Sequence, residues 1–308
     1  MTTTPKARPT LHLALDAGEK LLAEGPHPTR ARRDAETLLL HVLRQTAPEV
    51  NLAWLIAHDG DALAPEQAAV FCDAIERRLA GEPIQYITGE AEFYGLSFHL
   101  NRDVLIPRPE TELLVEKAIA FVGKLRQTNE ASEPRIVDVG TGSGAIAVAL
   151  AHALPFAEIA ATDISAPAIA VARSNAARNG LADRIRFLEG DLLAPVAGEQ
   201  FDLIVSNPPY VAEGDRAALD IEVRNYEPAQ ALFAGGDGLA IYRRLIPASF
   251  TSLAAGGILL LEIGYGQREA IDALLEICGF KEIEFFSDLQ GIPRVAKAPR
   301  IVSKVRQS

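Results

Sequence analysis

The spacing of apolar side chains divides the chain into two parts with different periodicities. Between about residues 11 and 80, apolar residues recur three or four positions apart, which is the spacing of one face of an α-helix. Pro65 suits a first helical turn, and Gly81 followed by Pro83 is a stop signal. This pattern predicts a small all-α helical domain over residues 1–83.

A β-prone segment follows the helical part. Between residues 85 and 106, aromatic and branched side chains are interrupted by glycine and asparagine, so we expect a β-hairpin linker over residues 84–106. Pro107 and Pro109 then precede a part-apolar run, which predicts a helix over residues 110–126.

After a polar loop at residues 127–134, strand-like runs alternate with helix-like runs. This alternation predicts an α/β domain over residues 107–308, with a mostly parallel seven-stranded sheet covered by helices on both faces. The expected strands are 135–139, 158–162, 185–189, 202–206, 257–263, 281–286 and 298–302. In such a sheet the ligand site lies at the carboxyl ends of the strands.

Composition limits the classes of function that the protein can have. With 30 Lys+Arg and 41 Asp+Glu, the net charge is −11, which disfavours binding to a phosphate backbone. Two cysteines and six histidines without ligand spacing indicate neither a disulfide framework nor a metal site. Residues 1–10 show no secretory signal, and no apolar stretch reaches the roughly 20 residues of a membrane span. We therefore expect a soluble, cytoplasmic protein.

A glycine-rich loop follows the first expected strand of the sheet. Gly140, Gly142 and Gly144 let backbone N–H groups approach a ligand closely. Asp163 ends the next strand about 20 residues later, where a carboxylate accepts hydrogen bonds from both hydroxyls of a ribose. The loop also satisfies the dinucleotide pattern G-x-G-x-x-A, so these features leave NAD open. Asp191 fits an adenine contact and an ordinary turn equally well.

A tetrapeptide at the end of another expected strand is more informative. The sequence Asn207-Pro208-Pro209-Tyr210 follows the apolar run that ends at Ser206. Two consecutive prolines fix the main chain and remove two donors. The side-chain oxygen of Asn207 and the carbonyl of Pro208 remain as rigid acceptors.

These acceptors suit a nitrogen that is a poor nucleophile. The lone pair of an amide or aniline-like nitrogen is delocalised, and two fixed acceptors on its N–H bonds rotate it out of conjugation. Tyr210 can stack on the planar group and hold it in line with an electrophile. Because fixing two reactants contributes about 7 to 11 kcal/mol and each hydrogen bond only about 1 kcal/mol, positioning should dominate catalysis.

Together these motifs resemble the release-factor glutamine methyltransferases. The resemblance extends over nearly the whole chain. Its combination with the sequence Arg-Pro-Glu-Thr-Glu at residues 108–112 is much more specific to this family than the glycine loop or the tetrapeptide alone. The other segments that carry it are 81–86, 93–95, 106–107, 138–144, 163–165, 207–210 and 288–291. It implies a Rossmann-like class I methyltransferase domain preceded by a helical substrate-recognition domain, with S-adenosylmethionine as cofactor.

The resemblance also implies a reaction. The glutamine side-chain amide in the Gly-Gly-Gln motif of class I peptide chain release factors receives the methyl group, and S-adenosylhomocysteine is the second product. Residues Asn207, Pro208, Pro209 and Tyr210 would form the catalytic and substrate-binding loop, with Asn207 also touching the cofactor. Arg108 and Glu110 would shape the substrate entrance, although an ordinary helix start explains them equally well.

The cofactor contacts that the resemblance implies are Gly140, Thr141, Gly142, Ser143, Gly144, Asp163, Asp191 and Leu192. Leu192 stands where some relatives have an aromatic residue, so apolar contact would replace stacking on the adenine.

Two other functions fit part of the pattern. A methyltransferase acting on exocyclic amines of DNA or RNA bases shares the tetrapeptide, and the charge of −11 counts against it. A non-catalytic adenosylmethionine-binding module explains the glycine loop and gives the tetrapeptide no purpose. We therefore expect a release factor as the partner, and neither a nucleic acid nor a membrane.

Overall fold

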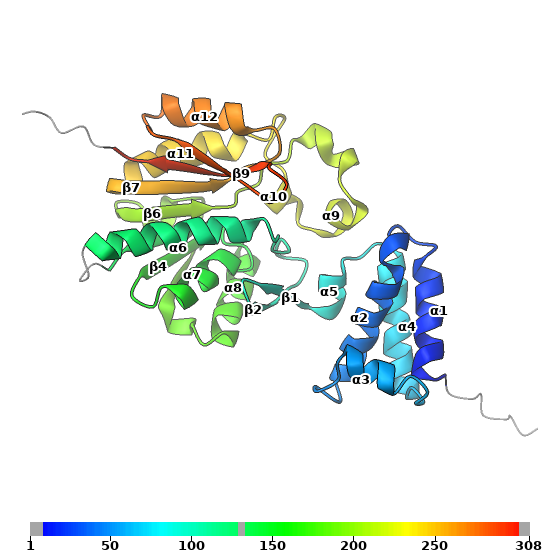
Figure 1. Ribbon diagram of the computed structural model, residues 1–308. Helices are drawn as coiled ribbons and strands as arrows, with labels where there is room; N and C mark the ends of the chain where they lie inside the picture. The colour runs from blue at the N-terminus through cyan, green and yellow to red at the C-terminus, as the bar shows by residue number, and fades with distance from the viewer. Residues whose placement is uncertain (1–8, 129–132, 302–308) are drawn as a thin grey trace, which may run out of the picture. The chain divides into compact units, whose positions relative to one another are not determined.

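The computed structural model describes residues 9–128 and 133–301, which form two compact units (Figure 1). The first unit extends to Gly89 and also contains Leu219–Tyr226. The second contains Glu90–Ala218 and the chain from Glu227 onward. Most of the amino-terminal segment in which no secretory signal is expected lies outside the described residues. No helix in the described ranges is long and apolar enough to cross a membrane.

The first unit is all-α, as its periodicity predicts. Its helices are α1 (Leu11–Leu22), α2 (Ala31–Arg44), α3 (Leu52–Ala57), α4 (Pro65–Leu79), α5 (Ile84–Thr88) and α9 (Ile221–Tyr226). Thr10 and Asn51 cap α1 and α3, since each side chain accepts a hydrogen bond from a backbone N–H three residues later. Leu38 and Leu39 of α2 are fully buried in the common core.

A buried ion cluster ties α9 to the other helices of this unit. The Arg78 side chain is 3% exposed, and its Nε donates to Oδ2 of Asp34 at 2.6 Å. Its Nη2 lies 2.7 Å from Oε1 of Glu222, and Nε2 of His27 lies at the same distance from that oxygen. Arg78 therefore compensates two carboxylates.

The expected β-hairpin linker is only partly correct. Strands β1 (Glu90–Phe93) and β2 (Leu96–His99) pair as an antiparallel hairpin, whereas the segment before them is helix α5. The Pro83 carbonyl accepts hydrogen bonds from the backbone N–H of Tyr86 and Ile87. Gly89 then ends the helix in the left-handed conformation. Tyr86 and Ile87 are buried neighbours on this single turn, so their apolar character indicated burial and not a strand.

The second unit contains the seven-stranded sheet. Its strands are β3 (Arg135–Val139), β4 (Glu158–Asp163), β5 (Ile185–Glu189), β6 (Phe201–Ser206), β7 (Leu253–Glu262), β8 (Glu284–Ser287) and β9 (Pro293–Pro299). They lie in the order β5-β4-β3-β6-β7-β9-β8, parallel from β5 to β7, with β9 antiparallel to both neighbours. The mostly parallel α/β fold is confirmed.

The last strand was misplaced in the sequence interpretation. The expected strand at 298–302 is instead β9, which begins five residues earlier at Pro293; residue 302 lies outside the described residues. The start of β9 is polar and contains Arg294. An antiparallel partner on each side supplies its hydrogen bonds, so pairing overrides the weak local pattern.

Helices cover both faces of this sheet (Figure 1). One layer consists of α6 (Thr111–Thr128), α7 (Ala145–Ala153) and α8 (Ala166–Arg178); the other consists of α11 (Ala240–Ser252) and α12 (Arg268–Ile277). The short helix α10 (Ala229–Leu232) precedes α11. The strand order reverses direction between β3 and β6, which is the topological switch point where such sheets bind ligands.

Candidate active site

The glycine loop leaves β3 at the switch point. Gly140 and Gly142 have φ of +76° and +55°, a region that disfavours side chains. A Cβ at either position would meet no atom within 4 Å, so the space above the loop is open. The backbone N–H groups of Gly140 and Thr141 both donate to the Thr162 carbonyl, which fixes the loop to β4.

Asp138 lies beneath this loop and is fully buried. The Thr141 hydroxyl donates to its Oδ2 at 2.6 Å, whereas Oδ1 has no hydrogen-bond partner among the described residues. Burial raises the pKa of Asp138 to about 7. Thr141 and the backbone N–H of Ala147 oppose this rise, and no donor among the described residues reaches Oδ1 within hydrogen-bonding distance.

Asp163 holds the other side of the loop. Its Oδ2 accepts a hydrogen bond from the backbone N–H of Gly142 at 2.8 Å, and its Oδ1 accepts one from Ser165 at 2.9 Å. Burial raises the pKa of this carboxyl. A carboxylate has about four lone-pair sites, so Asp163 retains acceptor capacity for hydroxyl groups.

The two residues after Gly190 differ in their surroundings. Asp191 forms an exposed ion pair with Arg244. Leu192 has φ of +49°, and its carbonyl accepts a hydrogen bond from the Thr162 hydroxyl at 2.8 Å. The Leu192 side chain packs, partly buried, against the sheet core. Leu192 therefore presents an apolar surface beside the end of β4.

The Asn-Pro-Pro-Tyr loop begins where β6 ends, beside the glycine loop. The Ser206 hydroxyl donates to the Val139 carbonyl at 2.6 Å and joins the ends of β6 and β3. Asn207 Nδ2 donates to Oγ1 of Thr111 at 3.1 Å, and that hydroxyl donates to Oε2 of Glu262 at 2.7 Å. Sequence reasoning did not single out Glu262. Its signal is an acidic residue that directly ends the apolar run 258–261.

Tyr210 is anchored by its main chain. Its carbonyl accepts a hydrogen bond from Gln267 Nε2 at 2.9 Å, and an added Cβ at Gly264 would lie 3.0 Å from its ring. Burial raises the pKa of the Tyr210 phenol to about 12. The phenol therefore stays neutral near pH 7.

Gly238 permits the close approach of this loop, and we expect Gly238→Ala to disturb it. Gly238 has φ of +73°, and an added Cβ would lie 2.3 Å from the Tyr210 carbonyl oxygen. Strain of this kind costs roughly 1 to 3 kcal/mol. Chemical denaturation should show that loss of stability, and a methyl-transfer assay should show lower turnover. Gly236→Ala is the matched control, since its Cβ would meet nothing within 4 Å; equal behaviour of the two variants would contradict the argument.

Arg108 and Glu110 lie just before α6. Arg108 forms an ion pair with the buried carboxylate of Glu227, which also accepts a hydrogen bond from the Ile106 N–H. Arg108 is therefore engaged within the protein. Burial raises the pKa of Glu262 to about 7, and the charge of Glu110 adds to this rise, so Glu110 shares the electrostatic environment of Glu262.

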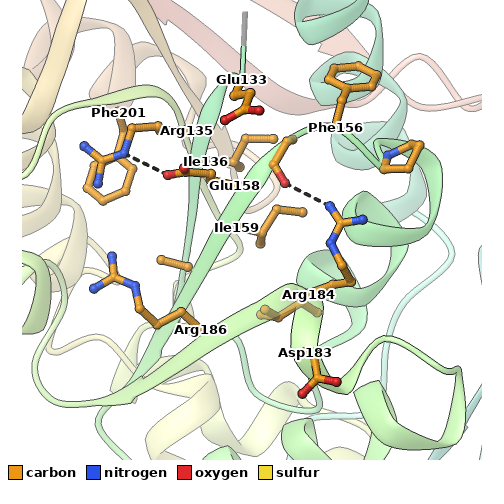
Figure 2. A pocket seen from close by; sticks show the side chains of 14 residues that line it. Glu133, Arg135, Ile136, Phe156, Glu158, Ile159, Asp183, Arg184, Arg186 and Phe201 are labelled. Atoms are coloured by element: carbon orange, nitrogen blue, oxygen red, sulfur yellow. Dashed lines mark hydrogen bonds and ion pairs between the residues drawn. The ribbon is translucent and has the colours of Figure 1, made fainter.

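A hollow of about 610 Å³ opens at the amino ends of the strands, and Figure 2 shows side chains that line it. It is lined by residues at the amino ends of β3, β4 and β5, away from the glycine loop. Arg135 Nε lies 3.4 Å from Glu158, and Arg184 donates to the Ala157 carbonyl at 3.1 Å. Because the hollow lies at the amino ends of the strands, it is separate from the site at the switch point. No group of three acidic, histidine or cysteine residues in the described part of the chain is placed to hold a metal ion.

Comparison with known proteins identifies the family. Residues 118–251 match the Methyltransferase small domain family, and residues 14–89 match the PrmC N-terminal domain family. A release factor glutamine methyltransferase from Bordetella pertussis is 43% identical over 270 residues, covering 87% of this chain and 95% of that protein. The chain belongs to the release factor glutamine methyltransferase family. A further member, from Moorella thermoacetica, is 42% identical over 94% of this chain and 99% of its own length.

A solved structure supports the fold of this family member. The hMettl16 catalytic domain in complex with a MAT2A 3′UTR hairpin has a TM-score of 0.55 and covers 86% of this chain and 92% of that chain. At 18% identity this likeness shows the shared methyltransferase fold alone.

Proposed function

We infer that the protein transfers a methyl group from S-adenosylmethionine to the side-chain amide nitrogen of the glutamine in the Gly-Gly-Gln motif of class I peptide chain release factors. One observation carries this inference: the Asn-Pro-Pro-Tyr loop and the glycine loop leave neighbouring strands at the switch point of a methyltransferase fold. Membership of the family supports the same reaction.

The residues around the glycine loop fit the cofactor. The unpartnered Oδ1 of Asp138 suits an ammonium group, and the open space above Gly140 and Gly142 admits a ligand close to the backbone. Asp163 would hold the ribose hydroxyls, with Leu192 as an apolar contact for the adenine. Thr141, Ser143, Gly144 and Asp191 complete the proposed contacts. When bound, S-adenosylmethionine supplies an electrophilic methyl group on a sulfonium.

The loop at residues 207–210 would position the nucleophile. Oδ1 of Asn207 and the Pro208 carbonyl accept the two N–H bonds of the substrate amide, and Pro209 keeps the main chain rigid. Tyr210 packs on the amide plane as a neutral phenol. These residues orient the nitrogen lone pair toward the methyl group without a covalent intermediate.

The helical unit would recognise the release factor, with Arg108 and Glu110 near the substrate entrance. Cys72 and Cys278 are both free thiols, which suits the cytoplasm, where we place the reaction. Methylation of nucleic-acid bases is not favoured, because the relatives that cover most of the chain are release factor glutamine methyltransferases.

Methyl transfer from labelled S-adenosylmethionine to a purified class I release factor tests this function. We expect one added methyl group on the Gly-Gly-Gln glutamine, located by mass spectrometry of the modified peptide. Nucleic acid is assayed in parallel. Label in nucleic acid alone would favour a base methyltransferase, and bound cofactor with label in neither would favour a binding module.

Asp163→Asn tests the proposed ribose contact. The substitution replaces an acceptor oxygen with an NH₂ group that opposes a backbone N–H, so cofactor affinity should fall by at least about 10-fold, or about 1.4 kcal/mol. Isothermal titration calorimetry with S-adenosylhomocysteine measures this change. Asp183→Asn, at the hollow on the opposite edge of the sheet, should bind the cofactor like the parental protein. Unchanged affinity in Asp163→Asn would remove Asp163 from the site.

A further inference from the structure

A chain of hydrogen bonds runs from Asn207 into the protein. Asn207 directly follows β6, Thr111 begins α6 and Glu262 ends β7, so three separate elements position one member each. Nδ2 of Asn207 donates to Oγ1 of Thr111 at 3.1 Å, and Oγ1 donates to Oε2 of Glu262 at 2.7 Å. Thr111 is 4% exposed and Glu262 is 2% exposed, so water does not compete for these bonds.

The chemistry of Glu262 fixes the direction of this chain. An ionised carboxylate only accepts hydrogen bonds, so the single hydroxyl proton of Thr111 is committed to it. The Thr111 oxygen is then left as an acceptor, which the NH₂ group of Asn207 satisfies and its carbonyl oxygen cannot. The Asn207 amide is thereby held in one of its two flip orientations, with Nδ2 turned toward Thr111.

We propose that Glu262 and Thr111 are positioning residues that select the amide orientation of Asn207, so that Oδ1 is free to accept an N–H bond of the substrate amide. The inference rests on the proposed function of Asn207. In the opposite orientation Nδ2 would face the substrate N–H, donor against donor, and the nitrogen would lose an acceptor.

The groups around Glu262 make this selection depend on pH. Thr111 and Asn207 donate toward its carboxyl, Arg294 of β9 and Glu110 act on it through charge, and Tyr242 of α11 donates to its main-chain carbonyl. Tyr210 lies close enough for the charge of Glu262 to raise the Tyr210 pKa. Burial is the largest cause and raises the pKa of Glu262 to about 7.

Protonation of Glu262 removes the constraint. A protonated carboxyl donates to Thr111, whose hydroxyl is then free to donate to Asn207. This reversed series of hydrogen bonds favours the flipped orientation of the Asn207 amide. Turnover should therefore fall as the pH decreases through about 7. The sign is opposite for stability: because the folded pKa is raised, ionised Glu262 costs stability above that pH, and the cost disappears as the pH falls.

The test compares Thr111→Val, Thr111→Ser and Glu262→Gln with the parental enzyme in methyl transfer to a release factor, over pH 6 to 9. We expect Thr111→Val and Glu262→Gln to lower kcat by at least about 10-fold with little change in the KM for S-adenosylmethionine. Thr111→Ser keeps the hydroxyl and should recover most of the loss. Thr128→Val, at the exposed far end of α6, controls for the same substitution outside the site.

Two readouts separate positioning from structural support. Glu262→Gln should lose the decrease of kcat below pH 7, yet its melting temperature at pH 8 should not fall, because a buried charge has been removed. Parental kcat in both Thr111→Val and Glu262→Gln, or equal impairment of Thr111→Ser and Thr111→Val, would overturn the proposal.

A measurement on the folded protein keeps the inference separate from the proposed function. The ¹⁵N–¹H signals of the Asn207 side-chain amide, assigned by their loss in Asn207→Ser, should shift with a midpoint near pH 7 and stop shifting in Glu262→Gln. If the parental enzyme placed no label in the release factor, the proposed methyl transfer would be refuted, and the Asn207 signals would still test the positioning by Thr111 and Glu262. Asn207 signals that do not titrate in the parental protein would overturn the proposed positioning.

Discussion

Asn207→Ala is expected to lower turnover by at least about 100-fold, equivalent to about 2.7 kcal/mol of transition-state stabilisation. The variant removes the acceptor that orients the substrate nitrogen, while the glycine loop and Asp163 keep their own hydrogen bonds. The KM for the release factor should change less than kcat, because the contact matters most in the transition state. Single-turnover methyl transfer measures the loss of turnover, and cofactor calorimetry measures whether the affinity for S-adenosylmethionine is retained.

The outcome also decides between two roles of Asn207. Asn101→Ala is the control, since Asn101 bonds to Asp103 in the turn after β2 and lies outside the proposed site. An S-adenosylmethionine affinity that falls as steeply as turnover would make Asn207 mainly a cofactor contact. Parental turnover in Asn207→Ala would exclude the positioning mechanism.

Arg78→Met is expected to lower the free energy of unfolding of the helical unit by about 3 to 5 kcal/mol. The substitution removes the cation that lies 2.6 Å from Asp34 and 2.7 Å from Glu222, and it leaves both carboxylates without that partner in a largely buried position. Chemical denaturation followed by circular dichroism measures the loss.

An exposed arginine of the same unit provides the comparison. The Arg32 side chain is 45% exposed and pairs with Asp16, Glu19 and Glu36, so Arg32→Met should cost no more than about 1 kcal/mol. Adding Asp34→Asn and Glu222→Gln to Arg78→Met should restore part of the stability, because the uncompensated charges are gone. A loss in Arg78→Met no larger than in Arg32→Met would show that the cluster is not a buried charge network.

Local sequence determined the helices of the first unit up to residue 80 and most of the sheet, whereas only the tertiary structure added α9 to that unit. Apolar residues at helical spacing and Pro65 at a helix start act within a few residues of chain, so the pattern predicts their effect. The glycine loop and the Asn-Pro-Pro-Tyr loop are also local, since each follows an apolar strand. Their place at adjacent carboxyl ends follows from parallel topology.

The tertiary structure alone decided which side chains meet. Helix α5 replaced an expected strand segment because Tyr86 and Ile87 are buried on a single helical turn that Gly89 ends. Strand β9 begins at Pro293 and Arg294, a weak start for a strand, because its neighbours on both sides supply pairing. In both cases contacts with distant residues outweighed a weak local preference.

The same reason explains why the sequence predicted only some of the residues of the site. Asn207 and the glycines were visible in the sequence because short motifs impose their conformation. Thr111 is 96 positions from Asn207 and 151 positions from Glu262 along the chain. Asp34 and Arg78 are 44 positions apart. Spacing and periodicity describe neighbours along the chain, whereas these hydrogen bonds exist only after the sheet and the helices have brought distant segments together.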